Sequence, residues 1–216
     1  MTLNDIDPTG TDPFVFRDIY PEIEEVPNGA MVSIPSFEII PIFNSFTFDD
    51  FASANFSQGL LELTIENSMV IPIGTPLVIE LLEVILGDTT NIPGAFLQFD
   101  TIIDANNGIA TGTIDLTNVS LPGEILVKVS GNCQGTSGVP IFIDEQAKNS
   151  GFVVSIGGSG LEVSEANAKI PQQSIEENGT ILLTPDSNKV VNALIEGGQL
   201  LIAVSYTHLT LPTTPV

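Results

Sequence analysis

The sequence is short of positive charge. Five lysine and arginine residues stand against 27 aspartates and glutamates, which gives a formal net charge of -22. A protein with this charge repels phosphate backbones and anionic lipid surfaces, so nucleic-acid binding is excluded. The same carboxylates favour solubility in salt and are able to bind divalent cations, which fits an extracellular or saline setting.

Histidine is nearly absent, and the single residue, His208, lies in an unusual C-terminal stretch, "VSYTHLTLPTTPV". One choice of codons for residues 204–213 reproduces a transposon-end sequencing adaptor, which this stretch resembles. The alternative is a linker rich in Thr and Pro. The resemblance implies that residues 204–216 are a non-native tail with no part in the fold, and we expect the natural chain to continue beyond Ala203.

Without the tail, the chain has no histidine, no tryptophan and one cysteine. Nucleophilic catalysis near neutral pH needs a base, usually histidine, so Ser-His-Asp and Cys-His arrangements are excluded within residues 1–203. Zinc sites built on His or on several Cys are excluded for the same reason. A glycosidase built on two carboxylates stays formally open, but little aromatic surface is available for stacking on a sugar. We therefore predict no enzymatic activity.

Signals for disulfide bonding, secretion and membrane insertion are also missing from the sequence. The single cysteine, Cys133, has no partner for an internal disulfide, and its setting "SGNCQGTSG" predicts a passive thiol in a loop. The start "MTLNDIDPTGTDP" has neither a basic region nor an apolar region of a signal peptide. The most apolar stretch, residues 69–86, contains two prolines and two glutamates, which argues against a membrane span.

Apolar and polar residues alternate along most segments, and Gly, Pro and Asn separate the segments. In "LLELTIEN" and "EILVKVSG" alternate aliphatic side chains fall on one face, as in a strand with one wet side. Turns are expected at residues 104–108, 121–123 and 157–160. "PLVIELLEVILG" also fits a short amphipathic helix, although its Val and Ile content favours a strand. The pattern predicts an all-β fold, an antiparallel Greek-key β-sandwich.

Two pairs of segments indicate an internal repeat. "ANFSQGLLEL", from Ala54, shares five positions with "ALIEGGQLLI", from Ala193, and "EVPNGAMVSIP", from Glu25, is echoed by "EVSEANAKIP", from Glu162. The alternative is a chance likeness between amphipathic strands. A tandem repeat divides the chain into four parts: the tail of a preceding unit or a linker (1–35), a β-sandwich domain (36–171), the start of a truncated repeat (172–203) and the non-native tail (204–216).

One stretch carries a resemblance to a known family. "LELTIENSMVIPIG" places an apolar strand before Asn67 and a second apolar run through Pro72. This layout resembles the opening of late-embryogenesis-abundant β-sandwich domains, although the Asn-Pro dipeptide of that family is absent. In general character the chain is also similar to the tandem acidic β-sandwiches of bacterial surface proteins. These resemblances imply a β-sandwich and no particular functional residue.

Calcium is the one cofactor that the sequence gives reason to consider. Calcium prefers about six to eight oxygen ligands, and "DTIIDANNG" offers Asp100, Asp104, Asn106 and Asn107 in one connection. "NDIDPTGTD" offers three further aspartates. Neither stretch has the spacing of an EF-hand, and Asx-rich turns are common for backbone reasons alone, so a calcium site and a plain turn both stay open.

The acidity, the repeat and the lack of catalytic side chains lead to one functional hypothesis and one alternative. The hypothesis is a non-enzymatic structural or adhesive repeat fragment of a bacterial surface or secreted protein, located at the cell surface or outside the cell. The alternative is a β-sandwich module that binds a glycan or a protein in a calcium-dependent way. The expected partners are neighbouring repeats of the same chain and a protein or glycan at a cell surface, with no nucleic acid and no membrane span.

Overall fold

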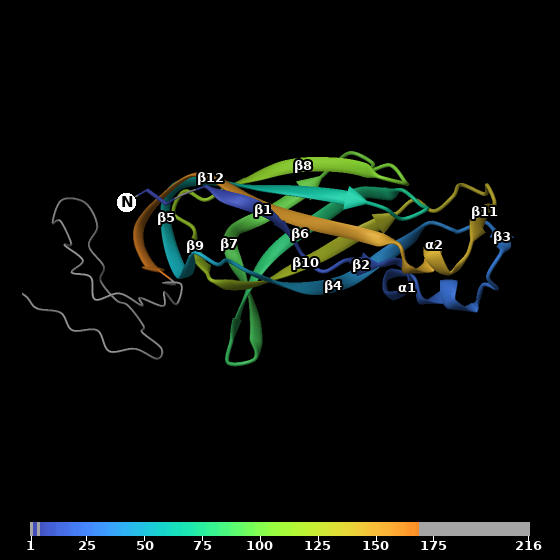
Figure 1. Cartoon of the computed structure of the whole chain (residues 1–216), viewed down its shortest axis with the longest axis horizontal. Helices are drawn as coiled ribbons and strands as arrows, with labels where there is room; N and C mark the ends of the chain where they lie inside the picture. The colour runs from blue at the N-terminus through green and yellow to red at the C-terminus, as the bar shows by residue number, and fades with distance from the viewer. Residues whose placement is uncertain (1, 4, 169–216) are drawn as a thin grey trace, which may run out of the picture.

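The computed structural model describes residues 2, 3 and 5–168 of the chain. Two antiparallel sheets pack face to face, and a two-stranded ribbon with short helices closes one end of the elongated body (Figure 1). The prediction of an all-β sandwich is confirmed by this arrangement. The Greek-key connectivity stays a prediction.

The six-stranded sheet is built around two long neighbouring strands, β5 (Phe51–Asn67) and β12 (Gly151–Ala168). Its path runs β1-β12-β5-β8, where β1 is Ile6–Gly10 and β8 is Gly108–Asp115. Two short strands extend it, because β2 (Phe14–Val15) pairs with β12 and β9 (Ser120–Pro122) pairs with β5. The sheet therefore joins segments from both ends of the described chain.

The four-stranded sheet has the order β4-β10-β6-β7. Its strands are β4 (Phe37–Thr47), β10 (Glu124–Cys133), β6 (Ile73–Ile85) and β7 (Asp88–Phe99). The stretch for which a helix was the alternative is thus the strand β6, as its β-branched content favoured. Beyond Leu82, β6 pairs only with β7, and the two form a hairpin that points away from the body on the side of this sheet (Figure 1).

Short elements form a cap at the end of the body opposite to the N-terminus (Figure 1). They are the ribbon of β3 (Ala30–Val32) and β11 (Ile141–Ile143), the helices α1 (Phe16–Ile19) and α2 (Glu145–Asn149), and the 3-10 helix η1 (Pro21–Glu25). Asp144 caps α2, because its side chain accepts a hydrogen bond from the amide of Ala147. Neither α1 nor α2, the helices of the described residues, has the length or the apolar run that a bilayer crossing requires.

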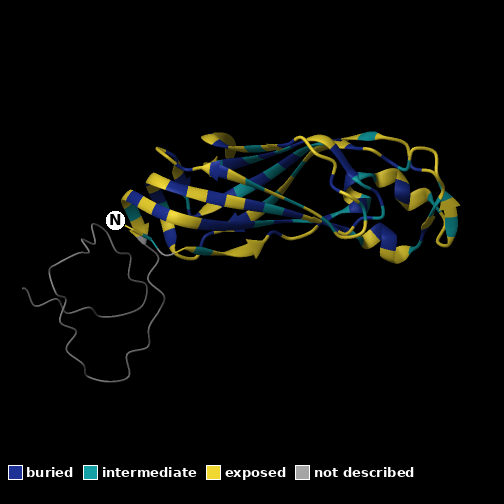
Figure 2. Ribbon diagram, turned by 90° about the horizontal axis from the view of Figure 1, so that it is seen from above, coloured by how far each residue is buried: buried dark blue, intermediate teal, exposed yellow. Residues whose placement is uncertain are grey.

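The core lies between the two sheets and follows from the alternation in the sequence. Buried and exposed residues alternate along the strands (Figure 2). In β5, Leu61, Leu63 and Ile65 are fully buried while Glu66 is exposed, as the period of two predicted. The inward face of β10 is equally apolar, so each sheet contributes a continuous layer of aliphatic side chains to the core.

Residues 6–35 belong to the same sandwich as residues 36–168, which differs from the predicted boundary at residue 35. β1 pairs with β12, and the ring of Phe14 in β2 stacks on Phe152 of β12 at 4.9 Å between centroids. Five apolar side chains of the segment enter the common core: Phe14, Phe16, Ile19, Ile23 and Ile34. The boundary was misplaced because pairing between strands so distant in sequence leaves no local pattern.

The turn predicted at residues 157–160 is instead an irregularity inside β12. The strand continues through this stretch, and its register against β5 shifts between Ser159 and Glu162. Gly160 has a φ of 61°, which is the left-handed conformation that a glycine bulge supplies. The two neighbouring glycines, Gly157 and Gly158, allow β1 to approach closely, because an added Cβ would lie within about 3.3 Å of Pro8 or Ile6 atoms.

The second pair of similar segments, which begin at Glu25 and at Glu162, differ in structure. Glu25 ends η1 and is followed by a turn and the short strand β3, whereas Glu162 lies inside the long strand β12. That echo therefore gives no support to a repeat. The first echo, from Ala193, and the predicted unit of residues 172–203 lie outside the described residues, so the tandem repeat stays a prediction.

The described chain enters and leaves the sandwich at the same end. Thr2 bridges to Glu162, and the amide of Leu3 donates to the carbonyl oxygen of Leu161 at 2.9 Å. The last described residue, Ala168, pairs with Phe51 at that end of β5. In Figure 1 the N-terminus and the end of β12 lie together, and the cap lies at the far end of the body.

Candidate functional site

The four predicted calcium ligands lie in the connection between β7 and β8. Asp100 follows β7, and its Oδ1 accepts a hydrogen bond from Gln98 Nε2 at 2.6 Å. Asp104, Asn106 and Asn107 form the predicted turn, in which both asparagines have positive φ values. Among the described residues, no three His, Cys, Asp or Glu side chains are grouped so that they could hold a metal ion. The aspartates of the first predicted stretch lie elsewhere, and Asp5 accepts from the amide of Gly160.

The turn is held by Asn67, a fully buried polar side chain at the end of β5. Its Nδ2 donates to the carbonyl oxygens of Asp104 at 2.9 Å and of Ile71 at 3.0 Å, and its Oδ1 accepts from the amide of Met69 at 3.1 Å. Its own carbonyl oxygen accepts from the amide of Asn107 at 2.7 Å. Asn67 therefore holds two loops against the end of β5. These hydrogen bonds explain the shape of the turn without a calcium ion.

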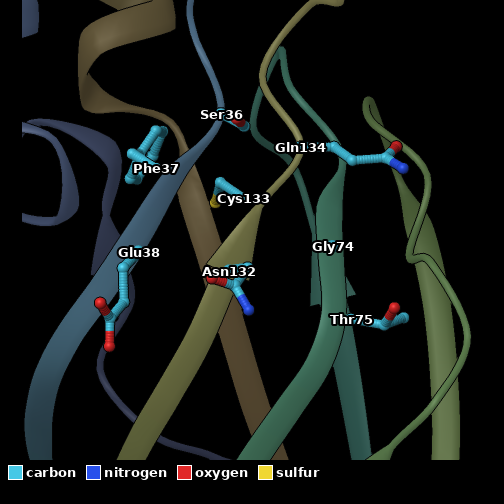
Figure 3. Close-up of a pocket in the computed structure, with 8 residues that line it drawn as sticks. All are labelled: Ser36, Phe37, Glu38, Gly74, Thr75, Asn132, Cys133 and Gln134. Carbon is cyan, nitrogen blue, oxygen red and sulfur yellow. The ribbon is translucent and has the colours of Figure 1, made fainter.

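An open depression of about 400 Å³ lies where β4 and β6 begin and β10 ends (Figure 3). Glu38 and Asn132 are cross-strand partners there, and their side chains extend from neighbouring strands. Gly74 permits this packing, because a Cβ at its position would lie 3.1 Å from the carbonyl oxygen of Asn132. Hydroxyl, amide and carboxylate groups dominate the lining: Ser36, Phe37, Glu38, Gly74, Thr75, Asn132, Cys133 and Gln134.

The groups that line this depression are suited to hydrogen bonding. Cys133 is the one nucleophile of its lining apart from hydroxyl groups, and its side chain is buried at the end of β10. Burial raises the pKa of the Cys133 thiol to about 12, so the thiol is protonated at neutral pH and is a poor nucleophile. The cysteine lies at the buried end of a strand and not within the predicted loop, and its passivity stays a prediction.

A charged network in the cap centres on Arg17 of α1. Its Nη2 donates to Glu145 Oε1 at 2.7 Å and also reaches Asn149 Oδ1, both in α2, and its Nε lies 3.1 Å from Glu24 Oε1 in η1. Asn28 Nδ2 donates to the other oxygen of Glu145 at 3.3 Å. The network joins elements that are more than a hundred residues apart in sequence, so it fixes the cap as one piece.

The other two basic side chains of the described residues are also engaged. Lys148 is buried in α2, and its Nζ donates to the carbonyl oxygens of Val26 at 2.7 Å and of Glu24 at 3.4 Å. Lys128 of β10 forms an ion pair with Glu80 of β6, with 2.5 Å between Nζ and Oε2. Each of the three basic side chains in the described part of the chain therefore has an acidic or carbonyl partner. None of the three is free to bind an anionic ligand.

The Glu145 network makes stability depend on acid pH. The hydrogen bond from Arg17, and then those from Asn28 and Asn149, lower the pKa of the Glu145 carboxyl. A carboxyl group whose pKa is lower in the folded state than in the unfolded state stabilises the fold. Its contribution is complete at pH values above the unfolded-state pKa and is lost as the pH falls through the folded-state pKa. We expect Glu145→Gln to lower the Tm near neutral pH and to have no effect in strong acid. Thermal melts across the acid pH range test this expectation. Glu22→Gln is the control, because it changes the charge by the same amount. A Tm difference for Glu145→Gln that persists at the lowest pH would contradict the expectation.

Sequence reasoning missed the roles of Asn67, Arg17 and Lys148. The signal for Asn67 was present, because an asparagine between two apolar runs needs buried hydrogen-bond partners. Arg17 and Lys148 carry two of the few positive charges in the sequence. Their scarcity could have marked them as structural, but their partners lie too far along the chain to be found by pattern.

Comparison with known proteins gives no match. No protein-family model, no curated protein and no solved structure is similar to the chain at a significant level. The fold by itself defines the class of the protein, an acidic all-β sandwich domain.

Proposed function

We propose that the chain is a non-enzymatic adhesive module of a bacterial surface or secreted protein. The observation that carries this proposal is the position of the first and last described residues. Because residues 2, 3 and 6 lie beside the last part of β12, a polypeptide that continued from both places would hold the domain by one end. The two sheet faces and the cap then project from the attachment point, where they are free to contact a partner.

The chemistry of the described residues supports binding over catalysis. The depression at the end of the four-stranded sheet contains hydroxyl, amide and carboxylate groups, and its cysteine has a raised pKa. Reversible adhesion needs only hydrogen bonds, charge and apolar area, all of which a rigid sheet surface provides. The strong negative charge keeps such a module soluble and separate from anionic surfaces.

An adhesion assay tests this function. Beads that carry the chain through a C-terminal tag are passed in flow over a panel of immobilised polysaccharides and matrix proteins. We expect retention on at least one surface, with no soluble sugar or peptide released from it. Beads that carry the Phe152→Ala variant are the control, because loss of this buried ring costs about 3–5 kcal/mol and leaves the net charge unchanged. Equal retention of both kinds of bead, or steady release of soluble product, would overturn the proposal.

A further inference from the structure

The outer face of the four-stranded sheet carries a row of four side chains in register. Phe43 of β4 pairs with Lys128 of β10, Lys128 pairs with Glu80 of β6, and Glu80 pairs with Phe96 of β7. The ion pair between Lys128 and Glu80 therefore lies between two phenylalanines. With neighbouring strands about 4.8 Å apart, the backbones of β4 and β7 that carry these phenylalanines are roughly 14 Å from each other across the sheet.

The two phenylalanines are exposed to solvent. Phe43 is 48% exposed and Phe96 is 62% exposed, and Ile40, farther along β4, is 76% exposed. Single exposed apolar residues are normal on a protein surface, but a group aligned on one sheet face marks a surface for interaction.

The β6–β7 hairpin adds an apolar tip beside the same face. Val84 and Ile85 are half exposed and Leu86 is fully exposed. Leu86 and Gly87 form the two-residue turn and have φ values of 53° and 92°. Asparagine or glycine is preferred at such a turn position, so the turn itself does not require a leucine there. The hairpin points away from the body on the side of this sheet, so its apolar tip projects beyond the sheet (Figure 1).

The surface is acidic as well as apolar. The four strands contain one cation, Lys128, and five acidic residues: Glu38, Glu80, Glu83, Asp88 and Glu124. Glu80 forms an ion pair with Lys128 and accepts a hydrogen bond from Asn91 at the base of the hairpin. The other four carboxylates have no ion pair with a basic side chain of the described residues. Charge complementarity therefore calls for a ligand that is apolar on one side and positively charged at its margins.

We propose that this surface, formed by the outer face of the four-stranded sheet and the hairpin tip, docks a cationic amphipathic helix of a partner protein. A helix with its side chains is about 10–12 Å across, which is similar to the distance between the strands that carry Phe43 and Phe96, so one helix lying over the row is wide enough to contact both rings. Its apolar stripe contacts the phenylalanines and Leu86, and its lysines or arginines face the surrounding carboxylates. A second copy of this chain is a poor occupant, because two such surfaces repel each other.

The inference rests on the proposed adhesive function and names the chemistry of its partner. A defined peptide provides the test: a labelled synthetic helix of leucine and lysine, with leucines on one face, titrated with the whole chain and followed by fluorescence anisotropy. We expect saturable binding that survives physiological salt. The Phe43→Ser/Phe96→Ser double variant should bind at least about tenfold more weakly, as for loss of central apolar anchors.

Two further variants separate docking from folding defects. Leu86→Asn places a residue that suits the turn conformation, so it should keep the Tm and still weaken binding by severalfold. Leu60→Ser/Ile109→Ser removes two exposed apolar residues from the outer face of the six-stranded sheet and should leave affinity unchanged.

Four results would overturn the docking proposal. They are equal affinity of the wild type and the double phenylalanine variant, binding that disappears at physiological salt, dimerisation of the free chain through this face in sedimentation, and insertion of the hairpin into neutral phosphatidylcholine vesicles without peptide binding. Bead adhesion that persists in the double phenylalanine variant would also reject this surface while leaving the adhesive function in place.

Discussion

A chain that begins at Ser36 should not fold cooperatively. It lacks β1, β2 and β3, and with them five buried apolar side chains: Phe14, Phe16, Ile19, Ile23 and Ile34. Burial of each such side chain contributes about 1.5–3 kcal/mol, so the loss is roughly 7–15 kcal/mol. That equals the whole stability of an ordinary domain, about 5–15 kcal/mol. Circular dichroism and a urea titration should show no sharp unfolding transition.

Fragment complementation provides the control for this deletion. A synthetic peptide of residues 1–35, added to the shortened chain, should restore a cooperative transition, because β1 and β2 supply the partner strands that one edge of β12 needs. The same peptide with Phe14→Ser should restore less structure, since it loses the stack on Phe152. A shortened chain that melts cooperatively without any peptide would show that residues 36–168 form a domain by themselves.

Asn67→Ala should be the most damaging single polar substitution in the described part of the chain. The change removes three side-chain hydrogen bonds and leaves the carbonyl oxygens of Ile71 and Asp104 without their donor in a buried setting. A buried polar group left without a partner costs about 1–3 kcal/mol, so we expect a total loss of roughly 2–4 kcal/mol. Urea unfolding, monitored by circular dichroism, measures this free energy.

Two matched substitutions show whether burial causes the effect. Asn67→Asp has nearly the same shape but replaces the donor by a carboxylate that faces two carbonyl oxygens, and it should destabilise the fold at least as much as Asn67→Ala. Asn91→Ala removes an exposed asparagine that bonds only Glu80 and should change stability by less than about 1 kcal/mol. Similar losses for Asn67→Ala and Asn91→Ala would mean that the buried bonds of Asn67 contribute little.

The stability tests and the docking test address different parts of the molecule. Asn67 and the residue 1–35 segment act on the core and on the loops beside it, whereas Phe43, Phe96 and Leu86 are exposed and contribute little to the core. Variants of the second group should therefore keep the wild-type unfolding transition. This separation allows a loss of binding to be assigned to the outer face of the four-stranded sheet and not to unfolding.

The sequence by itself determined the fold class, the strand faces and the charge. Alternation with a period of two is local, so the buried face of β5 and the strand character of β6 follow from a few neighbouring residues. The tertiary structure alone decided that residues 6–35 join the core, that the glycines near residue 160 bend a strand, and that Phe43 and Phe96 share an open face. Each of these depends on pairing between distant strands, whose register is set by the packing of the complete core and not by any one segment.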